Sequence, residues 1–78
     1  MGSKATEENF KKIELDAPAT KVVELVGEPD KKMKHPQFPS IEIWNYGESS
    51  HVSFDGGKVM SASYNDEMLV EKELPDDE

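Results

Sequence analysis

Residues 50–64 read SHVSFDGGKVMSASY, and this stretch decides the fold. Its first half alternates apolar and polar side chains, which places Val52 and Phe54 on one face of a strand. The glycine pair that follows supplies the positive φ that a two-residue hairpin turn needs. The second half again contains the β-branched and aromatic side chains typical of strands. The pattern therefore predicts a β-hairpin with strands at 50–54 and 58–64, in which Phe54 faces Val59 and Val52 faces Ser61.

A further strand is predicted at residues 40–46, and both of its faces are apolar. Ile41 and Ile43 point one way, whereas Trp44 and Tyr46 point the other way, so either pair could face the core. Two short helices cover only one face of a sheet. The second face then needs another cover: the apolar triplet at 68–70, a second copy of the chain, or a partner. Alternatively, a β-bulge changes the phase of the strand and turns all four large side chains inward.

Two short helices are predicted before the strands. Residues 6–13 begin with an N-capping threonine and place Phe10 and Ile13 on one helical face. The second helix has an apolar stripe of valines and a leucine along one side. It ends at Gly27, where glycine accepts a left-handed backbone, and Pro29 prevents its continuation.

The order of these elements defines the predicted fold. It is an α+β fold with two short N-terminal helices packed on one face of a three-stranded antiparallel β-meander (ααβββ), followed by an acidic C-terminal tail. One domain covers residues 5–65, residues 66–78 form the tail, and residues 1–4 are interpreted as the remnant of an expression tag. Residues 32–34 could add a short edge strand. The predicted core consists of Phe10, Ile13, Val22, Leu25, Val26, Val52, Phe54 and Val59.

Charge and missing residue types exclude several functions. The 78 residues carry a net charge of −8, contain no cysteine, and have lysine as their only strongly basic residue. An acidic chain lacks the cationic face that nucleic acid or an anionic membrane requires. Without cysteine there is no disulfide, thiolate nucleophile or cysteine-based zinc site. The charge is uneven, because residues 65–78 carry −6 and residues 1–64 only −2.

The sequence shows no catalytic or metal-binding constellation. His35 and His51 lie far apart in the chain, and the serines before His51 lack the Gly-x-Ser-x-Gly turn of a hydrolase. The acidic pairs near the C-terminus lack the alternating oxygen ligands of an EF-hand. We therefore predict that the chain is not an enzyme and binds no cofactor or metal.

Several motifs in the predicted order resemble the SmpA/OmlA (BamE-like) family. They are FKKIELDAPATKVVELVGEPD at 10–30, WNY at 44–46 and VSFDGGKV at 52–59. The resemblance covers residues 9–65 and extends to the ααβββ unit of beta-lactamase-inhibitor-protein-like domains. Three features differ from the family: its Gly-Met-Thr before the second helix is Pro-Ala-Thr at 18–20, the second helix ends in Val-Gly at 26–27 instead of Leu-Gly, and the chain has no lipobox cysteine. The resemblance implies a periplasmic or other extracytoplasmic location in the bacterial cell envelope, with the cytoplasm as the alternative.

The predicted function is a non-enzymatic protein-binding or scaffolding module. It would bind a protein partner through an aromatic and methionine patch on the open sheet face, without nucleic-acid binding or membrane insertion. An inhibitor-type module that binds an enzyme cleft and a self-associating domain, such as a homodimer, are the alternatives. A small-molecule binder would need an enclosed pocket of roughly 300 Å³ or more. The candidate partner-binding residues are Trp44, Tyr46, Met60, Tyr64 and Phe38.

Overall fold

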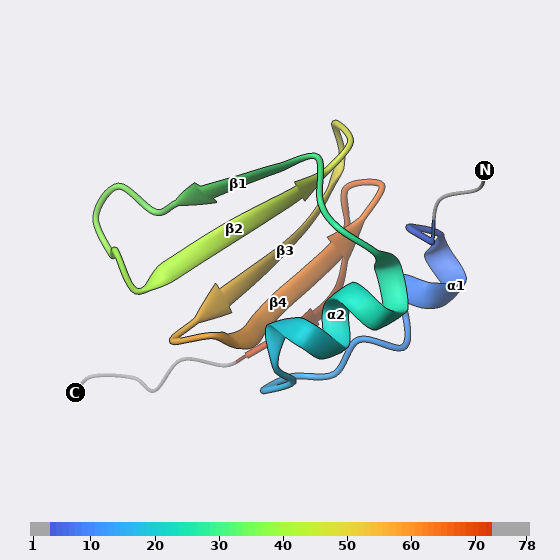
Figure 1. Cartoon of the computed structure of the whole chain (residues 1–78). Helices are drawn as coiled ribbons and strands as arrows, with labels where there is room; N and C mark the ends of the chain where they lie inside the picture. Colours follow the sequence, from blue (N-terminus) through green and yellow to red (C-terminus); the bar gives the residue numbers. More distant parts are fainter. Residues whose placement is uncertain (1–3, 73–78) are drawn as a thin grey trace.

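The structure is a computed structural model that describes residues 4–72. Two short helices precede five strands, and the strands form one antiparallel sheet in the order β1-β2-β3-β4-β5. Both helices lie on the same side of this sheet (Figure 1). The elements are α1 (Glu7–Phe10), α2 (Ala19–Val26), β1 (Lys31–Lys34), β2 (Ile41–Tyr46), β3 (Ser50–Asp55), β4 (Lys58–Tyr64) and β5 (Glu67–Glu71).

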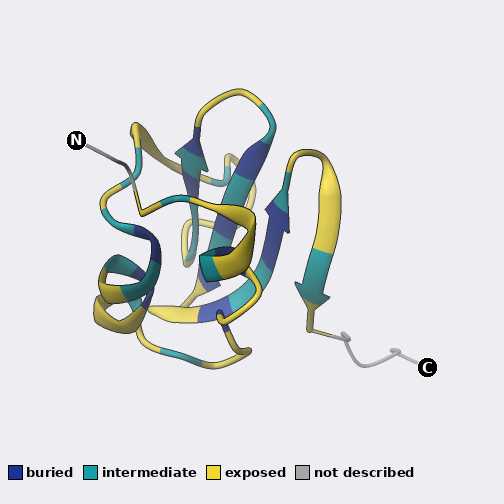
Figure 2. Cartoon of the chain, turned by 90° about the vertical axis from the view of Figure 1, so that its right-hand side faces the viewer, coloured by how far each residue is buried: buried dark blue, intermediate teal, exposed yellow. Residues whose placement is uncertain are grey.

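The predicted three-stranded meander is wrong, because the sheet has five strands. The broad α+β class and the two helices before the strands agree with the structure. The largest difference is β5, which lies within the stretch interpreted as an acidic tail. Asn65 and Asp66 both have positive φ, 55° and 68°, and form a tight turn after β4. Leu69 and Val70 then pack against the core, while the acidic side chains of β5 stay exposed (Figure 2).

The other additional strand, β1, pairs with β2 at the opposite edge of the sheet. All four of its residues are exposed. Sequence reasoning placed a possible edge strand at 32–34, and the structure has one from Lys31 to Lys34. Because the strand buries no side chain, its sequence lacks the apolar alternation that marks the inner strands.

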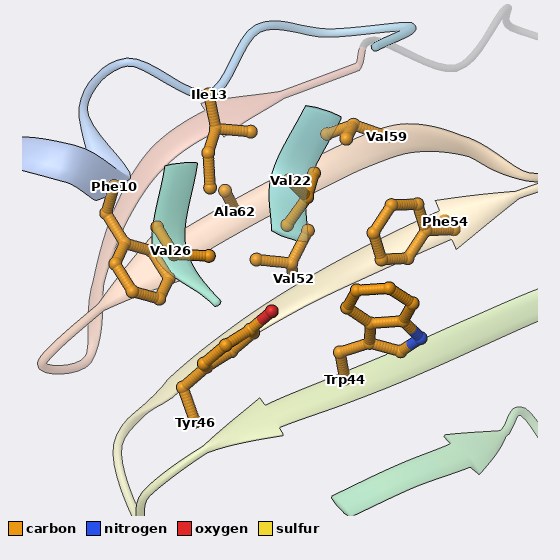
Figure 3. Packing of buried hydrophobic residues seen from close by; sticks show 10 residues of the cluster. All are labelled: Phe10, Ile13, Val22, Val26, Trp44, Tyr46, Val52, Phe54, Val59 and Ala62. Carbon is orange, nitrogen blue, oxygen red and sulfur yellow. The ribbon is translucent and has the colours of Figure 1, made fainter. Parts of the chain in front are cut away.

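The structure decides which face of β2 is buried. Trp44 and Tyr46 point toward the helices and are 4% and 7% exposed, whereas Ile41 and Ile43 lie on the opposite, open face and are half-buried. The ring centroid of Trp44 lies 4.5 Å from that of Phe54 on the neighbouring strand. The buried cluster consists of Phe10, Ile13, Val22, Val26, Trp44, Tyr46, Val52, Phe54, Val59 and Ala62 (Figure 3).

A β-bulge in β4 corrects the predicted hairpin register. The two-glycine turn is present, with φ of 64° and 87°, and Phe54 faces Val59 as predicted. The register then shifts, so Val52 faces Ala62 instead of Ser61. Met60 is the extra residue of the bulge, and the shift allows both Val59 and Ala62 to reach the core.

The helices supply the second layer of the core. The first is shorter than the predicted 6–13, yet Phe10 and Ile13 are both buried as expected. The second ends at Gly27, whose φ of 85° confirms the predicted stop. Leu25, which was predicted to be core, is only half-buried and packs against the cluster from outside.

Tyr46 connects the core to the end of α2. Its hydroxyl donates a 2.8 Å hydrogen bond to the carbonyl of Gly27, and its ring meets that of Phe10 edge to face at 5.3 Å. Burial, together with the nearby charge of Glu28, raises the pKa of Tyr46 far above its ordinary value of 10.0. The Tyr46 hydroxyl therefore keeps its proton in the folded state, where it donates the hydrogen bond to Gly27.

We expect this retained proton to make the fold sensitive to alkali. In the unfolded chain Tyr46 loses its proton near pH 10, while the folded chain retains it. The folded state then binds more protons, so the free energy of unfolding falls as the pH rises above about 10. Urea denaturation at several pH values measures this fall.

The variant Tyr46→Phe should have a free energy of unfolding about 1 kcal/mol lower at neutral pH, because it lacks the hydrogen bond. This free energy should then decline less steeply above pH ~10 than it does in the parent chain. Equal declines in both proteins would contradict the assignment.

Candidate partner-binding groove

The five predicted partner-binding residues do not form one patch. Trp44 and Tyr46 lie in the core on the helix side, because the alternation of β2 turns the isoleucines outward, so neither lines the open sheet face. Met60 is half-buried in the bulge. Tyr64 is half-buried, with its ring 5.1 Å from that of Phe10. Phe38 is 54% exposed, but it lies in the loop between β1 and β2.

The open face of the sheet is mixed in character. Met33 lies opposite Ile43 near one edge of this face, and Met68 lies opposite Ser63 near the other edge of the same face. Between these two edges, Ser53 of the central strand β3 pairs with Ser61 of β4. The two exposed methionines are therefore separated by hydroxyl groups, and the described residues of this face do not form the continuous aromatic and methionine patch that the sequence suggested.

A groove lies on the other face, between α2 and the β1–β2 side of the sheet. It has a volume of about 490 Å³ and is open to solvent rather than enclosed. The helix α2 places Val22 and Val26 over β3 and β4, where they meet Val52 and Ala62 (Figure 3). This leaves room between the helix and β1. The groove is lined by Ala19, Thr20, Val23, Glu24, Glu28, Lys32 and Trp44.

Charged side chains at the groove are paired with one another. The ammonium of Lys32 lies 3.7 Å from the carboxylate of Glu28 and 4.6 Å above the Trp44 ring. The carboxylate of Glu24 lies 3.9 Å from the ammonium of Lys21. These exposed pairs contribute little to stability. Each of the two carboxylates that line the groove, Glu24 and Glu28, therefore has a lysine ammonium beside it.

The indole nitrogen of Trp44 is the one buried side-chain nitrogen or oxygen without a hydrogen-bond partner within residues 4–72. In Figure 3 this nitrogen points away from Val52 and Tyr46, out of the core cluster. A buried N–H without an acceptor costs about 1–3 kcal/mol, and most such groups in folded proteins are satisfied. The nitrogen itself is covered by its neighbours, so an acceptor oxygen in the groove would remove this cost only after these neighbours moved aside. Nothing in the sequence indicates such a donor.

Other polar groups of the described region do not assemble into a reactive site. His51 Nε2 lies 3.1 Å from Ser63 Oγ, but Ser63 is only 4% exposed, and no carboxylate of the described residues hydrogen-bonds His51. His35 accepts hydrogen bonds from the backbone N–H groups of Gln37 and Phe38, and these bonds stabilise the turn that follows β1. Within residues 4–72 no three potential metal ligands come together.

Comparisons with family models, curated proteins and solved structures find no match for this chain. The resemblance to the SmpA/OmlA family therefore stays a prediction, as does the location in the cell envelope that it implies. None of the helices in the described part of the chain has the length and apolar character needed to cross a membrane.

Proposed function

We propose that the chain is a non-enzymatic protein-binding module whose binding site is the groove between α2 and β1. The observation that carries the proposal is the buried, unpartnered indole N–H of Trp44 beside an open groove of about 490 Å³. Binding sites combine apolar walls with a few placed polar groups, and this groove has that composition. Its volume suits one or two side chains of a partner.

The lining favours an uncharged, apolar peptide segment as the occupant. Ala19, Val23 and the Trp44 ring offer apolar contact, and the rim charges neutralise one another as ion pairs. A charged side chain would lose its hydration without gaining an unpaired opposite charge. A backbone carbonyl is the acceptor that every peptide supplies, and it would accept a hydrogen bond from the Trp44 indole once binding had displaced the side chains that cover this nitrogen.

The proposal is tested by selecting ligands from a display library of random short peptides and measuring their affinity for variants. Thr20→Glu places a carboxylate at the groove. Thr20 is exposed and lies in the first turn of α2, where negative charge is favourable, so the fold should tolerate the change. We expect selected apolar peptides to bind this variant at least about tenfold more weakly.

The matched control is Ser53→Glu, which adds the same side chain at the centre of the open sheet face. Affinity for the selected peptides should stay unchanged in this variant. The opposite pattern, with loss in Ser53→Glu and none in Thr20→Glu, would assign binding to the open face and contradict the proposal. Failure to select any apolar peptide would contradict it as well.

A further inference from the structure

The two edges of the sheet carry opposite charges. Among residues 4–72, the order of strands leaves β1 at one edge and β5 at the other, each paired on one side only. The edge strand β1 reads KKMK and carries three lysines, whereas β5 reads EMLVE and has a glutamate at each end. An edge strand presents unpaired backbone N–H and C=O groups, which are a template for another strand.

Four of these charges form no ion pair within the described part of the chain, although Glu42 of β2 lies opposite Lys34. Lys32 is already occupied by Glu28 and the Trp44 ring. In contrast, Lys31 and Lys34 on β1, and Glu67 and Glu71 on β5, form no ion pair with another residue among 4–72. The unpaired charges of the two edges are therefore equal in number and opposite in sign.

From this complementarity we propose that the chain associates with a second copy of itself, β1 of one copy pairing with β5 of the next. Pairing two β1 edges would place lysines against lysines, and pairing two β5 edges would place glutamates against glutamates, which is costly. Only the mixed contact brings edges of opposite net charge together. The proposal is independent of the groove, because it rests on the edges and not on Trp44.

The strand directions define the geometry of this contact. All neighbouring strands are antiparallel, so β1 and β5 run in the same direction. A second copy that keeps its helices on the same side therefore pairs in parallel. Met33 and Met68, which are 40% and 49% exposed, then lie on the same open face near the junction. Flexible methionine side chains adapt well to such a contact.

Such an interface is heterologous, so each added copy leaves one free edge at either end. The contact is also short, because β1 has only four residues. We therefore expect weak association into dimers and short chains that increases with concentration. Salt should reverse it, since the attraction between exposed charges is screened.

Sedimentation velocity of the full chain and of two charge-reversed variants tests the proposal. Lys31→Glu with Lys34→Glu makes both edges acidic, and Glu67→Lys with Glu71→Lys makes both edges basic. All four residues are exposed, so both variants should fold, which circular dichroism checks. Each variant alone should associate at least about tenfold more weakly than the parent chain. An equimolar mixture of the two should regain association, because each then meets an edge of opposite charge.

Lys12→Glu with Lys21→Glu is the matched control, since it changes the net charge equally on exposed residues of the helix side. Its association should equal that of the parent chain. A parent chain that stays monomeric at every concentration and at low salt would overturn the proposal, and would assign the edge charges to keeping strands apart. Association that persists in both reversed variants, or fails to return in their mixture, would overturn it too.

Discussion

Phe54→Ala is expected to lower the free energy of unfolding by about 3–5 kcal/mol, the largest effect of any single substitution considered. Phe54 is 1% exposed, lies on the central strand and packs against the Trp44 ring at an interplanar angle of 52°. Truncating its ring leaves a cavity that the neighbouring strands cannot fill. A chain of this size has a total stability of roughly 4–12 kcal/mol, so the loss is about a quarter of the total or more, and it unfolds the variant if the parent chain lies at the low end of this range.

Urea denaturation followed by circular dichroism measures the loss. The matched control is Phe54→Leu, which retains most of the apolar volume and should lose less than about 1.5 kcal/mol. A loss of under about 1 kcal/mol in Phe54→Ala would mean that the ring is not part of the packed core.

Ending the chain at Asn65 should have the second largest effect, because it removes β5. This strand pairs with β4 and brings Leu69 and Val70 against the core. Two half-buried aliphatic side chains and a row of backbone hydrogen bonds together stabilise by about 2–4 kcal/mol. Removal also turns β4 into an edge strand, although its residues Ala62 and Ser63 are buried in the complete sheet.

A chain ending at Lys72 is the control, since it retains β5. The shorter chain should melt at a lower temperature than this control, and by more than about 8 °C. Equal melting temperatures would show that β5 adds nothing to the stability of the fold.

Local signals predicted those parts of the fold that short stretches of chain decide. The glycine pair at 56–57 requires positive φ in both residues, and Gly27 followed by proline stops α2. In contrast, β5 was assigned from the sequence to an acidic tail, because acidic residues dominate the composition of residues 65–78. The turn before it uses Asn65 and Asp66 in a left-handed conformation, which these residue types adopt more readily than most. That dipeptide was the available signal for a fifth strand.

Contacts between elements that are distant in the sequence determine which face of β2 is buried and where the groove lies. Both faces of residues 41–46 are apolar, so only the position of the helices selects Trp44 and Tyr46 for the core. The position of the helices also determines where the candidate binding site lies. Trp44 was predicted to bind a partner, but on the open sheet face, whereas it lies beside a groove on the helix side. The distance between α2 and β1 creates that groove, and no local pattern encodes this distance.

Protein NMR of the Trp44 indole tests the central claim most directly. The chain has a single tryptophan, so its indole N–H gives one unambiguous cross-peak. If a bound peptide carbonyl accepts a hydrogen bond from this group, titration with a selected apolar peptide should move the proton resonance downfield. Trp44→Phe, which retains an aromatic ring without the donor, should bind the same peptide more weakly. A cross-peak that stays in place at saturation, together with unchanged affinity of Trp44→Phe, would contradict the assignment of the groove as the binding site.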